Sequence, residues 1–398
     1  MEQITTVVIG AGAAGLAVSH ELTAAGVEHV VLEKGRVGQT WRDRWDSFCL
    51  VTPNWSVQLP SGGYDGADPD GYMLRDDIVA FLERYADSFS PPVREGVDVH
   101  FAGSGIERKL LLATSAGDIQ TEAVVLATGS FQRPHRPPGA NSLPSGLFQV
   151  DLPGYRNAST LPPGKVLVVG SGQSGCQLAE ELKEAGRDVA IACGRAPWAP
   201  RRLGGEDIFT WVTRTPFFEA TAADLPSPQA RLAANIQATG HGGGHDLHYR
   251  TLHAMGIQLL GHFLGADGSQ AHFAPDLAES VAFGDARYTD LCNLIRRTCA
   301  ERGFPVPEMA PPGPFLAAAP DRQVAHLVRM HLDRQPGLAV HDHRLVHDDD
   351  DGAAGVLQNL AVRRLRVDRT AGHHQRRPAR RRINDGVAWI VLHHLDVL

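Results

Sequence analysis

The stretch TTVVIGAGAAGLAVSHELTAAGVEHVVLE, residues 5–33, decides the fold of this chain. Its β-branched start predicts a buried parallel strand over 5–9, and the pattern G-x-G-x-x-G follows at 10–15. A helix is predicted over about 13–25, where the next glycine ends it. A second strand over 29–33 completes the pattern. The stretch therefore predicts one βαβ unit of the dinucleotide-binding kind.

The same unit recurs as KVLVVGSGQSGCQLAEELKEAGRDVAIACGR, residues 165–195. A strand over 165–169, a glycine turn over 170–175, a helix over 176–185 and a strand over 189–192 are predicted. A single glycine pattern is weak evidence, because many glycine-rich loops bind nothing. Two patterns in the same strand-turn-helix-strand context predict two nucleotide sites.

The two predicted sites differ at the residue that faces the ribose. Glu33 ends the first unit and can accept hydrogen bonds from both ribose hydroxyls, which suits FAD or NAD. Arg195 takes the matching place in the second unit, with Arg201 and Arg202 nearby. A guanidinium can pair with a 2′-phosphate, so the second site favours NADPH. The alternative is that Arg195 is a solvated surface residue.

Composition limits the classes of protein. The chain has 398 residues, 43% of them apolar, and a formal net charge of −7, so neither nucleic acid nor an anionic membrane is an expected partner. No apolar run has the length of a membrane span and the N-terminus has no signal-peptide pattern, so a cytoplasmic protein is expected. The 5 cysteines contain no C-x-x-C pair, which disfavours a dithiol redox centre or a zinc ribbon; no metal site is expected.

Three segments are predicted along the chain. Residues 1–150 form an FAD-binding domain, and residues 160–310 form an NADPH-binding domain with inserted helices over 249–264 and 285–301. Residues 317–398 differ in composition and form an atypical tail. The expected fold class is α/β with two Rossmann-like domains. A permanently bound flavin is the simplest electron acceptor for the nicotinamide of the second site.

Taken together, these residues resemble the class B flavin-containing monooxygenases over about residues 4–310. The resemblance rests on VIGAGAAG at 8–15 with Glu33, GQTWR at 38–42, ATG at 127–129 and VVGSGQSG at 168–175. The stretch WRDRWDSFCLVTPNW, residues 41–55, is most similar to a bacterial flavoprotein subgroup.

The resemblance implies which residues bind the cofactors. FAD would be held by Gly10, Gly12, Ala13, Ala14, Gly15, Glu33, Lys34, Gly38, Gln39, Thr40, Trp41, Arg42, Val99, Ala127, Thr128 and Gly129. NADPH would be held by Gly170, Ser171, Gly172, Gln173, Ser174, Gly175 and Arg195. Within these sets, Val99 would offer backbone contacts to the adenine, and residues 128–129 would mark the crossing between the domains.

The implied reaction is an FAD- and NADPH-dependent monooxygenation. One oxygen atom of O2 would enter a small organic substrate through a C4a-hydroperoxyflavin, with NADP⁺ retained to shield it. Two alternatives stay open: an NADPH oxidase or flavoprotein reductase without oxygenation, and a non-catalytic dinucleotide-binding protein that lacks the C-terminal FAD segment. The oligomeric state is open as well, with a homodimer as one candidate.

Several residues have a functional and a structural interpretation. Asn54 is the catalytic candidate, placed over the flavin, and the equal alternative is a turn residue after Pro53. For Trp41, Trp45 and Trp55, ordinary core packing is favoured over flavin-pocket walls. Cys176 stands at a helix N-terminus, but without a partner cysteine a core role is favoured.

The chain departs from the family pattern in two places. Asp151 stands where many members carry a histidine before the second glycine turn, which puts the coupling of NADPH oxidation to oxygenation in question. In the tail, only 387–393 resembles a strand, and no return of the chain to the FAD domain is expected. Residues 373–378 resemble the product of a shifted reading frame. His341 and His343 are interpreted as residues of an exposed polar tail rather than as metal ligands.

The phosphate-reading role of Arg195 is open to a direct test. Replacing it (Arg195→Ala) is expected to raise the Michaelis constant for NADPH far more than that for NADH, because only NADPH carries the 2′-phosphate. Steady-state kinetics with both nucleotides measures this, and equal effects on the two would dismiss the role.

Overall fold

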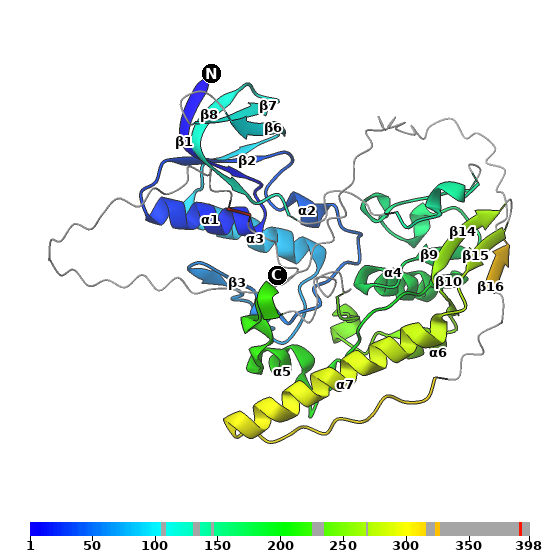
Figure 1. The fold of residues 1–398 in the computed structure, drawn as a ribbon. Coiled ribbons are helices and arrows are strands. Elements are labelled where there is room, and N and C mark those ends of the chain that lie inside the picture. Colours follow the sequence, from blue (N-terminus) through cyan, green and yellow to red (C-terminus); the bar gives the residue numbers. More distant parts are fainter. Residues whose placement is uncertain are drawn as a thin grey trace.

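The computed structural model describes residues 1–104, 109–129, 136–144, 147–224, 235–267, 270–315, 323–326 and 390–391. These residues form two α/β parts, and each begins with a strand, a glycine turn and a helix (Figure 1). The sheet of the first part is mixed, because β7 (Leu110–Thr114) pairs antiparallel with β6 (Val99–Ser104) and β8 (Ile119–Leu126), and the second part contains a three-stranded parallel sheet. The predicted fold class is confirmed. Among the described helices, none has the length and apolar character that crossing a lipid bilayer requires.

The first part is organised around β1. Its elements are β1 (Glu2–Ile9), α1 (Ala13–Ala24), β2 (His29–Glu33), α2 (Gln39–Arg42), β3 (Gln58–Leu59), β4 (Gly62–Gly63), α3 (Arg75–Phe89), β5 (Val93–Glu95), β6 (Val99–Ser104), β7 (Leu110–Thr114) and β8 (Ile119–Leu126). The main sheet has the order β5-β2-β1-β8-β7-β6. Strand β1 pairs in parallel with β2 on one edge and with β8 on the other. The glycine turn therefore leaves the middle of the sheet, where open α/β sheets bind their ligands.

Apolar side chains of β1 and α1 hold this part together. Val7 and Val8 of β1 are fully buried on opposite faces of the strand, as the β-branched run predicts. Leu16 of α1 packs with Ile78 and Leu82 of α3 in one cluster. Burying each such side chain stabilises the fold by about 1.5–3 kcal/mol. This packing fixes α1 against α3.

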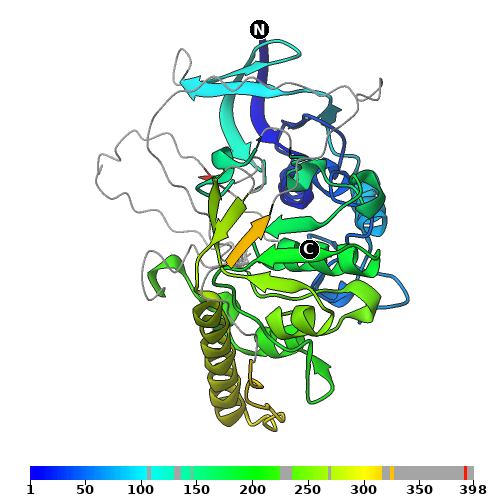
Figure 2. The ribbon, with the colours of Figure 1, turned by 90° about the vertical axis from the view of Figure 1, so that its right-hand side faces the viewer.

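The second part repeats the plan. Its elements are β9 (Val166–Val169), α4 (Gln173–Glu184), β10 (Val189–Ala192), β11 (Arg202–Leu203), β12 (Glu206–Asp207), α5 (Ile208–Arg214), α6 (Tyr249–Ala254), β13 (Gln258–Leu260), β14 (Phe263–Asp267), β15 (Gln270–Phe273), α7 (Leu277–Arg302) and β16 (Gln323–His326). The parallel sheet has the order β13-β10-β9 and the antiparallel sheet the order β14-β15-β16. Figure 2 shows the blue and cyan strands of the first sheet above the green strands of the second.

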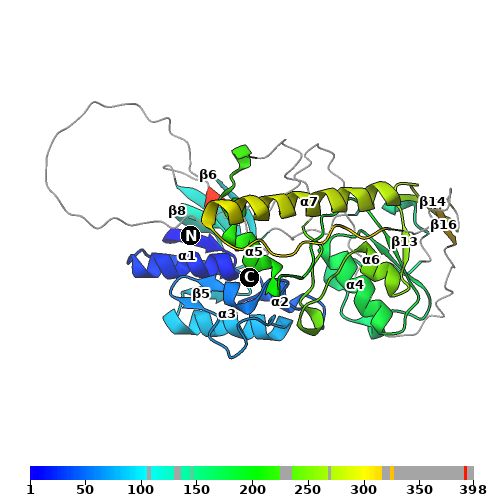
Figure 3. The same ribbon diagram turned by 90° about the horizontal axis from the view of Figure 1, so that it is seen from below.

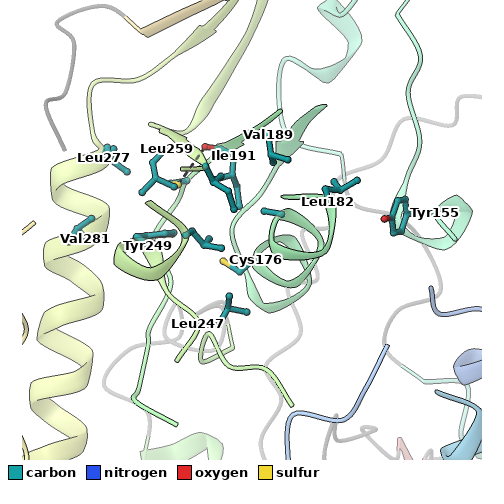
Figure 4. Close-up of a cluster of buried hydrophobic side chains, with 14 of the residues drawn as sticks. Tyr155, Cys176, Leu182, Val189, Ile191, Leu247, Tyr249, Leu259, Leu277 and Val281 are labelled. Carbon is teal, nitrogen blue, oxygen red and sulfur yellow. Dashed lines mark hydrogen bonds between the residues drawn. The ribbon is translucent and has the colours of Figure 1, made fainter. Parts of the chain in front are cut away.

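One hydrophobic cluster joins the elements of the second part. Ile191 of β10, Leu182 of α4, Tyr249 of α6 and Leu277 of α7 are all buried in it (Figure 4). Trp45 belongs to the same cluster although it comes from the first part. Helix α7 runs along one side of the molecule as a single long rod (Figure 3).

The structure corrects the predicted helix over 249–264. Helix α6 ends at Ala254, and Gly256 follows with φ +79°, a left-handed conformation that ends helices. The apolar residues beyond it belong to β13, which pairs in parallel with β10, and to β14. An apolar run of this length fits a helix or a buried strand equally well, and pairing with β10 decided between them. The helix predicted over 285–301 is confirmed, and it begins earlier, at Leu277.

The expectation that the chain does not return to the first part is wrong at one point. Strand β17 (Ile390–Val391) pairs in parallel with β8, opposite Val125 and Leu126. This strand lies within the one stretch of the tail that resembles a strand in sequence. The candidates at His341, His343 and 373–378 lie outside the described residues.

His248 caps helix α6 in its neutral form. Its Nδ1 accepts hydrogen bonds from the backbone N–H of Arg250 at 3.2 Å and of Thr251 at 3.4 Å. Burial lowers the pKa of His248 to about 4, while the charges of Asp246 and Asp285 oppose this and that of Arg250 adds to it. In the unfolded chain the pKa is near 6.5, so the unfolded state binds more protons between pH 6.5 and 4. The free energy of unfolding therefore falls as the pH falls through this window.

Replacing this histidine by a cap that does not titrate tests the assignment. The variant His248→Asn keeps a hydrogen-bond acceptor at the N-cap. When the pH falls from 6.5 to 4, its free energy of unfolding should fall by about 2 kcal/mol less than that of the wild type. Urea unfolding across this range measures the difference. The matched control is His253→Asn, at an exposed position of the same helix. A variant as acid-sensitive as the wild type would contradict a buried neutral His248.

Candidate functional site

In the first glycine turn, the first and third glycines lie against protein atoms, whereas the middle glycine faces open space. Gly10 has φ +107°, and a Cβ there would lie 2.4 Å from the carbonyl oxygen of Ala127. A Cβ on Gly15 would lie 1.8 Å from the carbonyl oxygen of Gly10. Neither position can carry a side chain. A Cβ on Gly12, in contrast, would have no heavy atom within 4 Å, which leaves room for a pyrophosphate to approach the backbone.

The second glycine turn has the same geometry. Gly170 has φ +104°, and a Cβ on Gly175 would lie 2.0 Å from the carbonyl oxygen of Gly170. Gly172 again faces open space. The two turns differ only in that a Cβ on Gly170 meets nothing within 4 Å. The reason is that β9 is an edge strand of its sheet, whereas β1 has β8 beside it.

Each turn leads into a helix whose first N–H groups are not capped by a side chain. Helix α1 has Gly12 as its N-cap and α4 has Gly172, and neither glycine can accept a hydrogen bond through a side chain. The predicted contacts at 13–14 and 173–174 are first-turn residues of these helices. Their backbone N–H groups and the positive end of the helix dipole form an anion site. The side chain of Gln173 donates to the carbonyl oxygen of Ile236 at 3.1 Å.

Glu33 lies where β2 ends, beside the first turn. Its carboxylate accepts hydrogen bonds from the backbone N–H of Ala11 at 2.7 Å and of Gly35 at 2.8 Å, one on each oxygen. Each oxygen keeps acceptor capacity for a ribose hydroxyl. The two backbone donors therefore orient the carboxylate for the ribose role that the sequence predicts.

Two further predicted FAD contacts lie near Glu33. The backbone N–H of Val97 donates to the carbonyl oxygen of Glu33 at 2.9 Å, which places the start of β6, and hence Val99, beside this site. Lys34 is exposed, and its Nζ lies 3.3 Å from a carboxylate oxygen of Asp98. Its ammonium group is therefore at the surface.

Residues 38–42 contain the short helix α2, which begins at Gln39. Gly38 has φ +71° at its N-cap, a conformation that favours glycine. Trp41 is buried and Thr40 is exposed, while the side chains of Gln39 and Arg42 form hydrogen bonds within the protein. Trp41 and Trp45 are both core residues, as the sequence favours, and Trp55 is half-buried.

Two buried polar atoms in this region suit a flavin ring. Trp41 Nε1 and Thr52 Oγ1 are buried and have no hydrogen-bond partner within the described part of the chain. Buried donors without a partner are uncommon, because each one costs free energy unless a ligand or water satisfies it. An isoalloxazine ring carries carbonyl oxygens and ring nitrogens that can accept from such groups. The residues present therefore fit this cofactor.

Residues 127–129 follow β8 next to the first turn. The backbone N–H of Ala127 donates to the carbonyl oxygen of Ile9 at 2.9 Å, which continues the pairing of β8 with β1. Thr128 is exposed, and Gly129 has φ +76°. The small residues here allow the close approach to Gly10 described above.

Asn54 is held on both sides of its amide. Its Nδ2 donates to the carbonyl oxygen of Asp68 at 2.9 Å, and its Oδ1 accepts from the backbone N–H of Met73 at 2.6 Å. The side chain thus joins Asn54 to the loop over 68–73 and is buried. These contacts give Asn54 a structural role in holding the loop together. The catalytic role of Asn54 stays a prediction.

Of the three arginines considered for the 2′-phosphate, Arg195 is best placed. It lies three residues after the end of β10, its side chain is 69% exposed, and its Nη2 lies 4.0 Å from a carboxylate oxygen of Glu279. Arg201 is 3% exposed and pairs with Asp207 through hydrogen bonds of 2.6 and 2.9 Å. Its guanidinium is committed to that partner and is therefore not available to a 2′-phosphate. Arg202 is exposed on β11.

Arg201 instead joins the two parts of the molecule. Its Nη1 donates to the carbonyl oxygen of Val51 at 2.8 Å, and its guanidinium lies 4.7 Å from the ring centroid of Tyr72. The hydroxyl of Tyr72 donates to Asp207 at 2.5 Å. We call Arg201, Asp207 and Tyr72 the junction cluster. No local pattern indicates it, because Tyr72 and Asp207 are 135 residues apart in the sequence.

All five cysteines are buried and none forms a disulfide. Burial raises the pKa of Cys49 to about 11 and that of Cys193 to about 12, and it raises the pKa of Cys176 well above its usual value. A thiolate is therefore disfavoured at each of these three positions, although Cys176 lies at the start of a helix. The predicted core role of Cys176 is confirmed.

Asp151, the predicted replacement of a family histidine, forms an ion pair with Arg136. Its carboxylate lies 2.9 Å from Nη2 of Arg136 and accepts a second hydrogen bond from the Nε of that residue at 3.0 Å. Both residues belong to the connection between the two sheets. The pair holds this connection together through its side chains.

Known proteins share this arrangement. The sequence profile described as pyridine nucleotide-disulphide oxidoreductase matches residues 7–214. A CzcO-like oxidoreductase of Geobacillus kaustophilus is 39% identical over 213 residues, which cover 53% of this chain and 60% of that protein. Indole-3-pyruvate monooxygenase YUCCA4 of rice is 31% identical over 196 residues, 44% of each chain. A flavin-containing monooxygenase from Stenotrophomonas maltophilia has the same fold, with a TM-score of 0.53 and 20% identity over 69% of this chain and 74% of that one.

The share of each chain that is matched decides whether the family of this chain is established. The match spans about 60% of the length of the Geobacillus relative. The family profile covers just over half of the present chain and includes both glycine turns, Glu33 and Arg195. The chain therefore belongs to the pyridine nucleotide-disulphide oxidoreductase family.

Proposed function

We propose that this protein is a flavin-dependent NADPH oxidoreductase that uses O2 to oxygenate a small organic substrate. FAD binds at the first glycine turn and NADPH at the second. The observation that carries the proposal is the repeated geometry of the two turns, each closed at its third glycine, Gly15 or Gly175, and open at its second, Gly12 or Gly172. Glycine-rich loops without a ligand have no need for this shape at two separate places.

The first site suits FAD better than FMN. The uncapped N-terminus of α1 can bind a pyrophosphate, and the carboxylate of Glu33 can accept hydrogen bonds from the two hydroxyls of an adenosine ribose. FMN has neither a pyrophosphate nor an adenosine. Trp41 Nε1 and Thr52 Oγ1 offer donors to the ring system.

The second site suits a nucleotide with a 2′-phosphate. Arg195 is exposed at the end of β10, and a guanidinium can form two parallel hydrogen bonds with a phosphate. Glu279 faces the same guanidinium at 4.0 Å and leaves its donors available. NADPH can therefore be distinguished from NADH by one strong contact.

The bound flavin supplies the redox chemistry, since it accepts a hydride and can pass electrons to O2. The chain positions the two nucleotides: the N-termini of α1 and α4 hold the phosphates, and Glu33 and Arg195 select the riboses. The junction cluster holds the two sites relative to each other, because a buried arginine that pairs with Asp207 and donates to Val51 resists separation of the parts.

Oxygenation is favoured over disulfide reduction within this family. A disulfide reductase needs a reactive cysteine pair, whereas each cysteine of this chain is buried and unpaired. The rice relative, whose name states a monooxygenase, supports the same choice. The specific organic substrate would be a small molecule.

A second candidate function is NADPH oxidation with release of hydrogen peroxide. The observation that favours it is Asp151, which occupies the histidine position of the family pattern and pairs with Arg136. Electron transfer to O2 would then occur without transfer of oxygen to a substrate.

The spectrum of the purified protein tests the proposal. The full chain should be yellow, and anaerobic NADPH should bleach its visible flavin band; in air, NADPH should be consumed. The number of hydrogen peroxide molecules formed per NADPH consumed should fall when an amine, sulfide or ketone substrate is accepted. This ratio should stay near one if the protein is an oxidase. A colourless protein that takes up no added FAD would overturn both candidates.

Two alanine variants separate the two sites. The variant Gly12→Ala should lower FAD affinity by about tenfold or more while the free energy of unfolding of the apoprotein changes by less than about 0.5 kcal/mol, because its Cβ enters only the open phosphate space. The variant Gly172→Ala should retain FAD and weaken NADP⁺ binding to the same degree. Flavin content and calorimetric titration with NADP⁺ measure both effects.

Each variant is the control for the other, and Gly15→Ala is the control for misfolding. It should destabilise the fold itself by more than about 2 kcal/mol, because its Cβ would lie 1.8 Å from a carbonyl oxygen. Normal flavin and NADP⁺ binding in Gly12→Ala and Gly172→Ala would show that neither turn holds a phosphate.

A further inference from the structure

The residue before Arg195 is held by a closed ring of three hydrogen bonds. The backbone N–H of Gly194 donates to Ser171 Oγ at 2.9 Å. The hydroxyl groups of Ser171 and Tyr249 lie 2.6 Å apart. Tyr249 Oη in turn donates to the carbonyl oxygen of Gly194 at 2.5 Å. Both polar backbone groups of Gly194 are thus satisfied by side chains.

The chemistry of the groups gives this ring a single direction. An N–H group can only donate and a carbonyl oxygen can only accept, so Tyr249 must donate to Gly194. The Ser171 hydroxyl must then donate to Tyr249, since the single hydrogen of Tyr249 is already used. Each hydroxyl donates once and accepts once within the ring, and loss of either hydroxyl leaves at least one group without a partner.

The ring is shielded from solvent. Ser171 is 3% exposed and Tyr249 is 4% exposed, and Figure 4 shows Tyr249 among the apolar side chains of the second part. Burial raises the pKa of Tyr249 well above its usual value, so its hydroxyl keeps its hydrogen at any pH at which the protein works. Water cannot easily replace a lost partner here, which makes the loss costly.

The three residues come from elements that are anchored independently. Ser171 belongs to the second glycine turn, and its carbonyl oxygen accepts from Nε2 of the buried Gln237 at 2.9 Å. Cys193, one residue before Gly194, donates its backbone N–H to Leu260 at 2.9 Å. The ring thus connects the glycine turn, the end of β10 and the start of α6. The chain leaves this fixed point at Arg195, whose side chain extends into solvent.

We propose that Tyr249, acting with Ser171, is a positioning residue for recognition of the 2′-phosphate. It fixes the backbone from which Arg195 extends, at a set distance from the turn that binds the pyrophosphate. This inference rests on the proposed NADPH function of the second site. It also gives the Ser171 side chain a role different from direct contact with a phosphate, because the only hydrogen of its hydroxyl is donated inside the protein.

The test compares two adenine nucleotides that differ only in the 2′-phosphate. Calorimetric titration of the full-length, FAD-loaded protein with 2′,5′-ADP and with 5′-AMP gives a ratio of affinities that reports reading of the 2′-phosphate. The variant Tyr249→Phe should lower this ratio by about fivefold to tenfold, which is the loss expected when one buried hydrogen bond is removed. A role in stability alone would weaken both ligands equally and leave the ratio unchanged.

A matched control is available in the same part of the molecule. Tyr288 is also buried, and its hydroxyl donates to the carbonyl oxygen of Ala310 at 3.0 Å, away from Gly194. The variant Tyr288→Phe removes one buried tyrosine hydroxyl and should leave the ratio unchanged. The melting temperature of both variants shows whether their stabilities are comparable.

A second variant keeps the test decisive if Tyr249→Phe fails to fold. Ser171→Ala breaks the same ring from the glycine turn and should lower the ratio by a similar factor. Where both single variants fold, the double variant should be no worse than the poorer single one, because the ring is already open. If the wild type prefers 2′,5′-ADP and neither variant lowers the ratio, the inference is overturned while the NADPH proposal stands. If the wild type shows no preference, the NADPH proposal fails first and the inference fails with it.

Discussion

The arrangement of this protein depends on a backbone contact that excludes every side chain. In each βαβ unit, the third glycine lies so close to the carbonyl oxygen of the first that a Cβ would come within about 2 Å of it. This contact sets the start of α1 beside β1 and the start of α4 beside β9. The uncapped helix N-termini then face the open side of the turn, where a phosphate can reach them.

Under the proposed function, the same backbone geometry serves two chemically different nucleotides because the discriminating charge lies outside the turn. A carboxylate at Glu33 matches hydroxyl groups, and a guanidinium at Arg195 matches a phosphate. The supports differ as well. Glu33 is oriented by backbone N–H groups of its own unit, whereas the segment that carries Arg195 is held by hydroxyls from Ser171 and Tyr249.

Membership of a family does not decide which reaction the nucleotides serve. The family is described by disulfide chemistry, yet the cysteines of this chain are buried and separate, and burial holds the pKa values of Cys49, Cys176 and Cys193 high. What the structure shows is the pair of glycine turns and, at the junction of the two parts, the buried contact between Arg201 and Asp207. Function on such a fold is determined by the site rather than by the fold.

Local sequence alone determined both βαβ units, because glycine spacing and β-branched runs act within about 30 residues. Glu33 and Arg195 could be found in the same way, at the ends of predicted strands. Tertiary structure decided the rest. The chain leaves helix α6 and forms β13 because β10 offers an edge for pairing. Arg201 is a junction residue because Asp207 and Tyr72 surround it. The tail reaches the first sheet where β17 pairs with β8. Ser171 and Tyr249 are 78 residues apart, and no periodicity or motif records a contact between residues that only the folded chain brings together.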